Sequence, residues 1–161
     1  MAIKIILVIT LLLLFYQDVK HRAVWFFLPP LFLLLGTYLF YSNAEPYFYL
    51  YCISINLIVV TAVLAIMYIV SKYLLKKNFF KEAFGVADFI IFYGLALSFP
   101  TISFFTFFVF SAISSIGLYL YLKHSNSSKA ITAPLAGSIS IFLIGVYVSH
   151  WSGLYDKMYF L

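Results

Sequence analysis

Long apolar runs fill most of this 161-residue chain and constrain its fold more than any other feature. Hydrophobic residues make up 65% of the sequence and charged residues only 9%, which is more apolar surface than the core of a soluble domain can hide. We therefore predict an all-α, polytopic membrane protein, a six-transmembrane-helix bundle that forms a single domain over residues 1–161 within the lipid bilayer. The apolar runs occupy approximately residues 2–16, 24–41, 47–75, 89–99, 102–122 and 131–151.

The basic residues indicate how such a bundle is oriented. They cluster in the breaks after the first, third and fifth runs, whereas the breaks after the second and fourth runs hold no basic residue. With six helices, the three basic breaks share one face, which the positive-inside rule assigns to the cytoplasm. We expect a multi-pass protein of the inner (cytoplasmic) membrane with both termini outside. Because the net charge of +5 is confined mainly to these breaks, we expect no nucleic-acid partner.

Two of the runs are short for a membrane span. The first would rise ~22 Å and the fourth even less, against a hydrocarbon core of ~30 Å. We expect the first helix to continue through Asp18 towards Arg22, and the fourth helix to begin before Gly85, near Lys81. Both extensions bring an aspartate, Asp18 or Asp88, to a similar depth below the cytoplasmic surface.

Asp18 and Asp88 would be suited to acid–base chemistry if they lay together. A carboxylate costs ~2.5–3.5 kcal/mol at the centre of a membrane helix, so it needs water, a partner or a function. Two adjacent carboxyls share a proton, so one can draw a proton from water while the other polarises a peptide carbonyl. This is the chemistry of an aspartic protease, and it needs no metal or cofactor. The small residues Gly85 and Ala87 would let a substrate backbone approach closely.

Each aspartate also has a structural interpretation. Asp18 and Arg22 stand four residues apart, which is the spacing of an ion pair on one face of a helix. Asp88 is placed to act as the N-cap of a short fourth helix. The matching depth and face of the two acids favour the paired interpretation.

The prolines predict where helices bend or end. Pro29 and Pro30 lie inside the second run, where we expect them to kink the helix. Pro100, followed by Thr101, predicts a tight turn between the fourth and fifth helices.

The remaining reactive residue types do not form a recognisable site. Cys52 is the only cysteine and lies among apolar residues, which predicts a buried, inert thiol. The three histidines, His21, His124 and His150, are dispersed over both faces of the expected bundle. We therefore expect no metal site.

Three segments of the chain resemble the type IV prepilin peptidases and archaeal preflagellin peptidases, which are membrane aspartyl proteases with a GxGD motif. Residues 18–24 (DVKHRAV) are similar to the family's segment after its first core helix, and residues 85–88 (GVAD) resemble GxGD itself. Residues 129–136 (KAITAPLA) are similar to the proline-containing start of its last helix. The order and spacing of the three motifs agree with the family over nearly the whole chain.

The resemblance implies an aspartic-type endopeptidase whose active site faces the cytoplasm and removes short basic leader peptides from type IV pilin-like precursors. Asp18 and Asp88 would be its catalytic residues, with the motif residues Lys20, Arg22, Gly85, Ala87 and Pro134 supporting the site or the approach of the substrate. The chain departs from the family at Ala87, which stands where the second glycine is usual, and at Trp25 and Phe26, which replace a proline and an asparagine. It also lacks the cysteine-rich insert of the bacterial enzymes.

Two other functions remain open from the sequence. A catalytically inactive relative that serves as a membrane assembly or scaffold component would use both aspartates only for stability. A small transporter would use Asp88 as a proton site. Transporters of this kind often contain inverted repeats, and we find none in this sequence.

Overall fold

The computed structural model describes residues 2–21, 24–74, 85–125, 135–154 and 158–159. These residues form six α-helices and no strand, which confirms the all-α prediction. The helices are α1 (Ala2–His21), α2 (Leu28–Asn43), α3 (Pro46–Ile69), α4 (Val86–Ser98), α5 (Thr101–Ser125) and α6 (Leu135–Trp151), and a π-helical turn, η1 (Val70–Leu74), extends α3.

Three of the described helical segments are long enough and apolar enough to cross a membrane. They comprise Ala2–His21, Pro46–Tyr73 and Thr101–Leu118. The other three helices are shorter: α2, α4 and α6 rise about 24, 20 and 26 Å at 1.5 Å per residue. The lengths and composition indicate a membrane protein with at least these three candidate spans.

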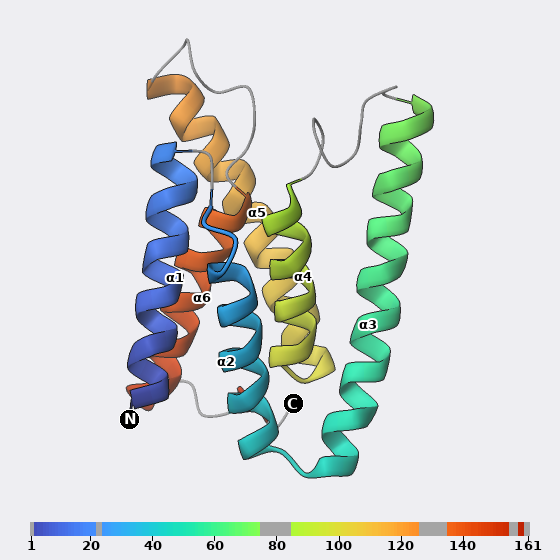
Figure 1. Ribbon diagram of the computed structural model, residues 1–161, viewed down its shortest axis with the longest axis vertical. Coiled ribbons are helices and arrows are strands. Elements are labelled where there is room, and N and C mark those ends of the chain that lie inside the picture. Colours follow the sequence, from blue (N-terminus) through green and yellow to red (C-terminus); the bar gives the residue numbers. More distant parts are fainter. Residues whose placement is uncertain (1, 22–23, 75–84, 126–134, 155–157, 160–161) are drawn as a thin grey trace.

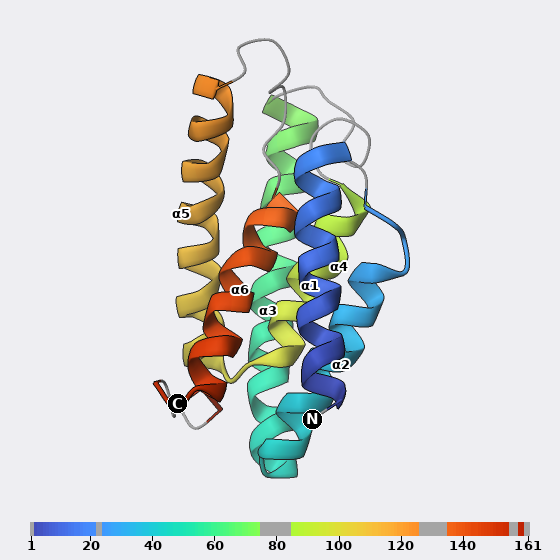
Figure 2. The same ribbon diagram turned by 90° about the vertical axis from the view of Figure 1, so that its left-hand side faces the viewer.

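The short helices occupy the middle of the bundle. α2 and α4 make the most extensive contact, and α6 packs against both α1 and α5. Figure 1 shows α3 at one side of the bundle beyond α4, and Figure 2 shows α5 at the opposite side of α6 from α1. The start of α1 and the end of α6 lie at the same end of the bundle, where Lys4 Nζ lies 5.2 Å from the centre of the Trp151 ring.

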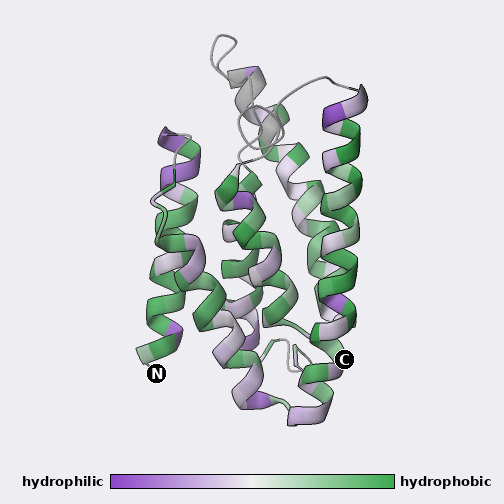
Figure 3. Cartoon of the chain, turned by 45° about the vertical axis from the view of Figure 1, so that its right-hand side comes forward, coloured by the Kyte–Doolittle hydropathy of each residue, from purple (hydrophilic) through white to green (hydrophobic). Residues whose placement is uncertain are grey.

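The outer surface is apolar along most of the helix lengths. Figure 3 shows hydrophobic residues along the helices and hydrophilic residues mainly towards their ends. Large apolar side chains are exposed on several helices, including Ile58, Ile113, Ile116 and Leu120. Such an extensive exposed apolar surface is stable in contact with lipid but not with water.

Several helix boundaries can be compared with the sequence predictions. α1 continues through Asp18 to His21 as expected, and α4 and α5 are joined by the expected turn at Pro100. The prediction that the fourth helix begins before Gly85 is wrong, because Gly85 is extended (φ −74°, ψ 148°) and α4 begins at Val86. Lys81 lies outside the described residues.

The predicted kink at Pro29–Pro30 is also wrong. α2 begins at Leu28, so both prolines lie in its first turn. The backbone N–H groups of a first turn have no partner within the helix, and proline therefore removes no hydrogen bond there. The two prolines start the helix instead of bending it.

Two glycines allow α2 and α4 to approach closely. A Cβ atom on Gly36 of α2 would overlap Ser98 Oγ, and a Cβ atom on Gly94 of α4 would lie 2.8 Å from a ring carbon of Phe32. Small residues at helix crossings are the usual means of close packing in membranes, where no hydrophobic effect drives helices together.

A buried asparagine joins α3 to the end of α4. Asn56 has no exposed surface, and its Nδ2 donates hydrogen bonds of 2.9 Å to the carbonyl oxygens of Ala96 and Phe99. The last carbonyls of a helix have no partner within that helix. Asn56 therefore supplies from α3 the donor that the C-terminal end of α4 needs. Cys52, which the sequence analysis predicts to be buried, also lies on α3 and is a buried free thiol.

We expect Asn56→Leu to lower the free energy of unfolding by about 1–3 kcal/mol, because two buried carbonyls lose a donor. The measurement is unfolding of the purified protein by SDS in mixed micelles. Ser54→Ala is the matched control, since Ser54 is an exposed residue of the same helix whose hydroxyl donates to Leu50 O, one turn earlier. Equal effects of the two substitutions would contradict the proposed role of Asn56.

Candidate active site

Asp18 lies near the end of α1 and contacts the start of α6. Its Oδ2 accepts a hydrogen bond of 2.6 Å from the backbone N–H of Gly137. Gly137 is the third residue of α6, so its N–H belongs to the first turn and has no acceptor within the helix. The positive end of the helix dipole also favours a carboxylate at this position.

Asp88 occupies the first turn of α4. Gly85 is the N-cap of this helix, so Asp88 is its third helical residue and not the N-cap considered from the sequence. The Asp88 carboxylate lies within hydrogen-bonding reach of two backbone N–H groups, those of Gly85 and Ala136. The contact with Gly85 is one half of a capping box, in which the third residue of a helix bonds back to the N-cap.

The structure brings Asp18 and Asp88 together, although about seventy residues separate them in the sequence. Asp18 bonds to Gly137 and Asp88 lies against Ala136, so the two carboxylates use neighbouring N–H groups of α6. They interact electrostatically and line one cavity of about 280 Å³, which we call the aspartate cavity. Its remaining walls are small or apolar and consist of Val24, Phe26, Pro29, Gly85, Val86, Ala87 and Ile90.

This geometry suits the sharing of a proton. When both carboxylates are ionised they repel one another, and protonation of one of them removes the repulsion. The N–H of Gly137 in α6 fixes the Asp18 carboxylate. Among the described residues, no group of three or more histidine, cysteine or acidic side chains is placed to hold a metal ion.

The other residues predicted for the site divide into three groups. Gly85 and Ala87 line the aspartate cavity. Lys20 does not: its ammonium group donates a hydrogen bond to the Tyr16 hydroxyl and lies over the Tyr16 ring. Arg22 and Pro134 lie outside the described residues, so the suggested Asp18–Arg22 ion pair stays a prediction.

The sequence analysis did not identify Gly137 as part of the site. A Cβ atom at this position would lie 3.2 Å from Asp18 Oδ2 and 3.3 Å from Asp18 Cβ. Such contacts are tight, so a residue with a side chain would push Asp18 away. The small pair Ala136–Gly137 at the start of the last apolar run was the available signal.

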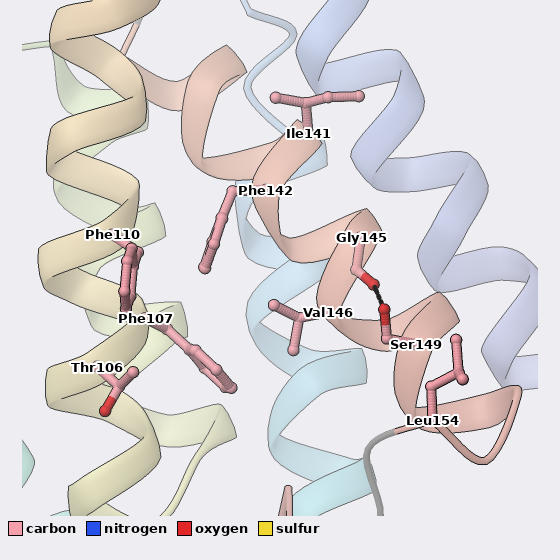
Figure 4. Close-up of a pocket in the computed structure, with 9 residues that line it drawn as sticks. All are labelled: Thr106, Phe107, Phe110, Ile141, Phe142, Gly145, Val146, Ser149 and Leu154. Carbon is pink, nitrogen blue, oxygen red and sulfur yellow. Dashed lines mark hydrogen bonds between the residues drawn. The ribbon is translucent and has the colours of Figure 1, made fainter.

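A hollow larger than the aspartate cavity lies elsewhere and has a mainly apolar lining. It measures about 720 Å³ and lies between α5 and α6, where Phe107, Phe110 and Phe142 form much of its wall (Figure 4). Ser149 donates a 2.7 Å hydrogen bond to Gly145 O within α6. None of its lining residues is acidic, basic or a thiol. Of these two hollows, only the smaller aspartate cavity is lined by groups capable of acid–base chemistry.

We expect Gly137→Val to displace Asp18 and lower the free energy of unfolding by about 1–3 kcal/mol, the usual cost of overpacking. SDS unfolding in mixed micelles again measures the change. Gly145→Val is the matched control in the same helix, because a Cβ atom at Gly145 meets nothing within 4 Å. A Gly137→Val variant as stable as this control would show that α6 does not hold Asp18 tightly.

The chain was compared with models of known protein families, with characterised proteins and with solved structures. None of them matches it. A functional proposal therefore depends on the motifs in the sequence and on the geometry of the aspartate cavity.

Proposed function

We propose that this protein is an aspartic endopeptidase of the membrane that removes short basic leader peptides from type IV pilin-like precursors. The observation that carries the proposal is that Asp18 and Asp88, from two helices distant in sequence, line the same cavity. The resemblance of residues 18–24, 85–88 and 129–136 to the prepilin peptidases supplies the substrate class. The chemistry needs only the two carboxyls and a water molecule.

In the proposed reaction, the two aspartates share one proton. The ionised carboxylate takes a proton from the attacking water, and the protonated carboxyl donates a hydrogen bond to the carbonyl of the scissile peptide. The N–H of Gly137 holds the Asp18 carboxyl in place, and Asp88 lies against Ala136 beside it, so little reorganisation is needed during the reaction. Ala87 lies in the wall of the cavity, where its methyl group narrows the space for the substrate.

The proposed location is the cytoplasmic side of the inner membrane, with six spans and both termini on the other side. The basic residues of the sequence support this orientation. Figure 1 also shows α3 and α5 extending beyond the start of α4 at the end of the bundle that holds Asp88. If the bundle axis follows the membrane normal, the aspartate cavity is recessed at this face. A precursor could then enter with its basic leader in the cytoplasm and its apolar helix in the lipid.

A second function is a non-catalytic scaffold, and one observation favours it specifically. Asp18 accepts a backbone hydrogen bond at the start of α6, and Asp88 lies within reach of backbone N–H groups at the starts of α4 and α6, which is a structural role sufficient to retain them. The alanine at position 87 is consistent with a relative that has lost activity. In that case both aspartates would matter for stability alone.

We expect Asp18→Asn and Asp88→Asn each to abolish cleavage of a pilin-like precursor, because neither amide can take or share the proton. The protein is co-expressed with a precursor that carries a basic leader, and the mass of the precursor is measured. Glu45→Gln is the matched control, since Glu45 is an exposed acid at the α2–α3 turn, at the other end of the bundle.

The two candidate functions predict different results in this assay. The peptidase predicts cleavage by the wild type and by Glu45→Gln, with none in either aspartate variant. Activity that survives in Asp18→Asn or Asp88→Asn would disprove the catalytic pair. A correctly inserted wild type that leaves the precursor uncut, together with an equally inactive Ala87→Gly variant, would favour the scaffold.

A further inference from the structure

A second polar cavity lies beside the last turn of α1. It measures about 400 Å³ and we call it the Gln17 cavity. One part of its wall carries hydrogen-bonding groups, and the other part is apolar. The wall is formed by Tyr16, Gln17, His21 and Trp25 together with Leu13 and Val24.

Gln17 is the most unusual residue in this wall. Its side chain is only 6% exposed, although it belongs to a helix with a largely apolar surface. Its Oε1 accepts a 2.9 Å hydrogen bond from the backbone N–H of Trp25, which fixes the turn after α1. No hydrogen bond from its amide nitrogen to another described residue is seen. This amide nitrogen therefore has donor capacity left for a partner, and the cavity is the space in which a partner can lie.

One cation stands next to the same cavity. Lys20 donates to the Tyr16 hydroxyl, and the rings of Tyr16 and His21 meet edge to face with their centres 6.3 Å apart. Tyr16 and His21 both line the cavity, so these contacts order its polar rim. Lys20 also offsets the partial negative charge at the C-terminal end of α1.

We propose that the Gln17 cavity binds the headgroup of an anionic phospholipid. A phosphodiester has only acceptor oxygens and one negative charge, which match the amide of Gln17, the hydroxyl of Tyr16 and the ammonium of Lys20. Leu13 lies one turn further towards the middle of α1, where an acyl chain would continue along the helix. Basic pockets between helices at the cytoplasmic face are a common form of lipid recognition. This site shares only Val24 with the wall of the aspartate cavity and does not depend on the peptidase proposal.

The test is titration of the delipidated, full-length protein in detergent with phosphatidylglycerol, and in parallel with phosphatidylcholine. Native mass spectrometry counts the bound lipids. We expect one phosphatidylglycerol to bind in preference to phosphatidylcholine. Lys20→Gln should weaken the binding of phosphatidylglycerol about fivefold, the usual effect of one basic residue near an anionic lipid. Gln17→Glu should weaken it more than tenfold, because glutamate keeps the acceptor for Trp25 but replaces the amide donor with a negative charge.

Lys72→Gln is the matched control. Lys72 is an exposed lysine in η1 that lies over Tyr68 and Tyr73, as Lys20 lies over Tyr16, but its tyrosines do not line the Gln17 cavity, whereas Tyr16 does. Lys72→Gln should leave the affinity for phosphatidylglycerol unchanged within twofold. Lys20→Arg, which keeps the positive charge, should bind this lipid as tightly as the wild type. Equal binding of the two lipids, or equal losses in Lys20→Gln and Lys72→Gln, would overturn the proposal. Displacement of the lipid by inorganic phosphate at equimolar concentration would identify a site for free phosphate and would likewise overturn it.

Discussion

The first turn of α6 is the point on which the arrangement of the candidate site depends. Its N–H groups lie inside the bundle and need acceptors from outside the helix. Asp18 of α1 bonds to Gly137, and Asp88 of α4 lies against Ala136, so one helix start holds two carboxylates that the sequence places far apart. The same atoms would cap α6 and carry out the chemistry. A substitution at either aspartate therefore affects both stability and the proposed activity, which is why a stability measurement must accompany any activity assay.

A lipid environment explains why few polar contacts are needed to pack the remaining helices together. Apolar side chains face outward, and close packing replaces the hydrophobic effect where helices meet. Gly36 and Gly94 let α2 and α4 touch, and Asn56 satisfies the end of α4 from α3. The aspartate cavity is thus built where short central helices begin, surrounded by longer ones. This position places two acids inside an apolar protein near one end of the bundle and away from its middle.

Much of this arrangement could be predicted from the sequence. The apolar runs predicted the number and order of the helices, and the matching depth of Asp18 and Asp88 favoured a pair. The start of α4 was missed because Gly85 adopts an extended conformation that an apolar pattern does not encode. The effect of Pro29 and Pro30 was predicted wrongly because the second apolar run begins before α2 does, so hydropathy alone does not show where the helix starts. The contacts of Gly137 and Asn56 depend on which helices are neighbours, and a single sequence does not specify that.

The most direct test of the central claim is cross-linking of positions 18 and 88 in native membranes. Cysteines are introduced as Asp18→Cys and Asp88→Cys in a Cys52→Ser background, treated with a short bifunctional thiol reagent, and the linked peptides are identified by mass spectrometry. The account predicts efficient linkage of this pair and none between Asp18→Cys and Glu45→Cys, which lie at opposite ends of the bundle. Failure of the 18–88 pair to link, while both cysteines react singly with a monofunctional reagent, would contradict a shared aspartate cavity.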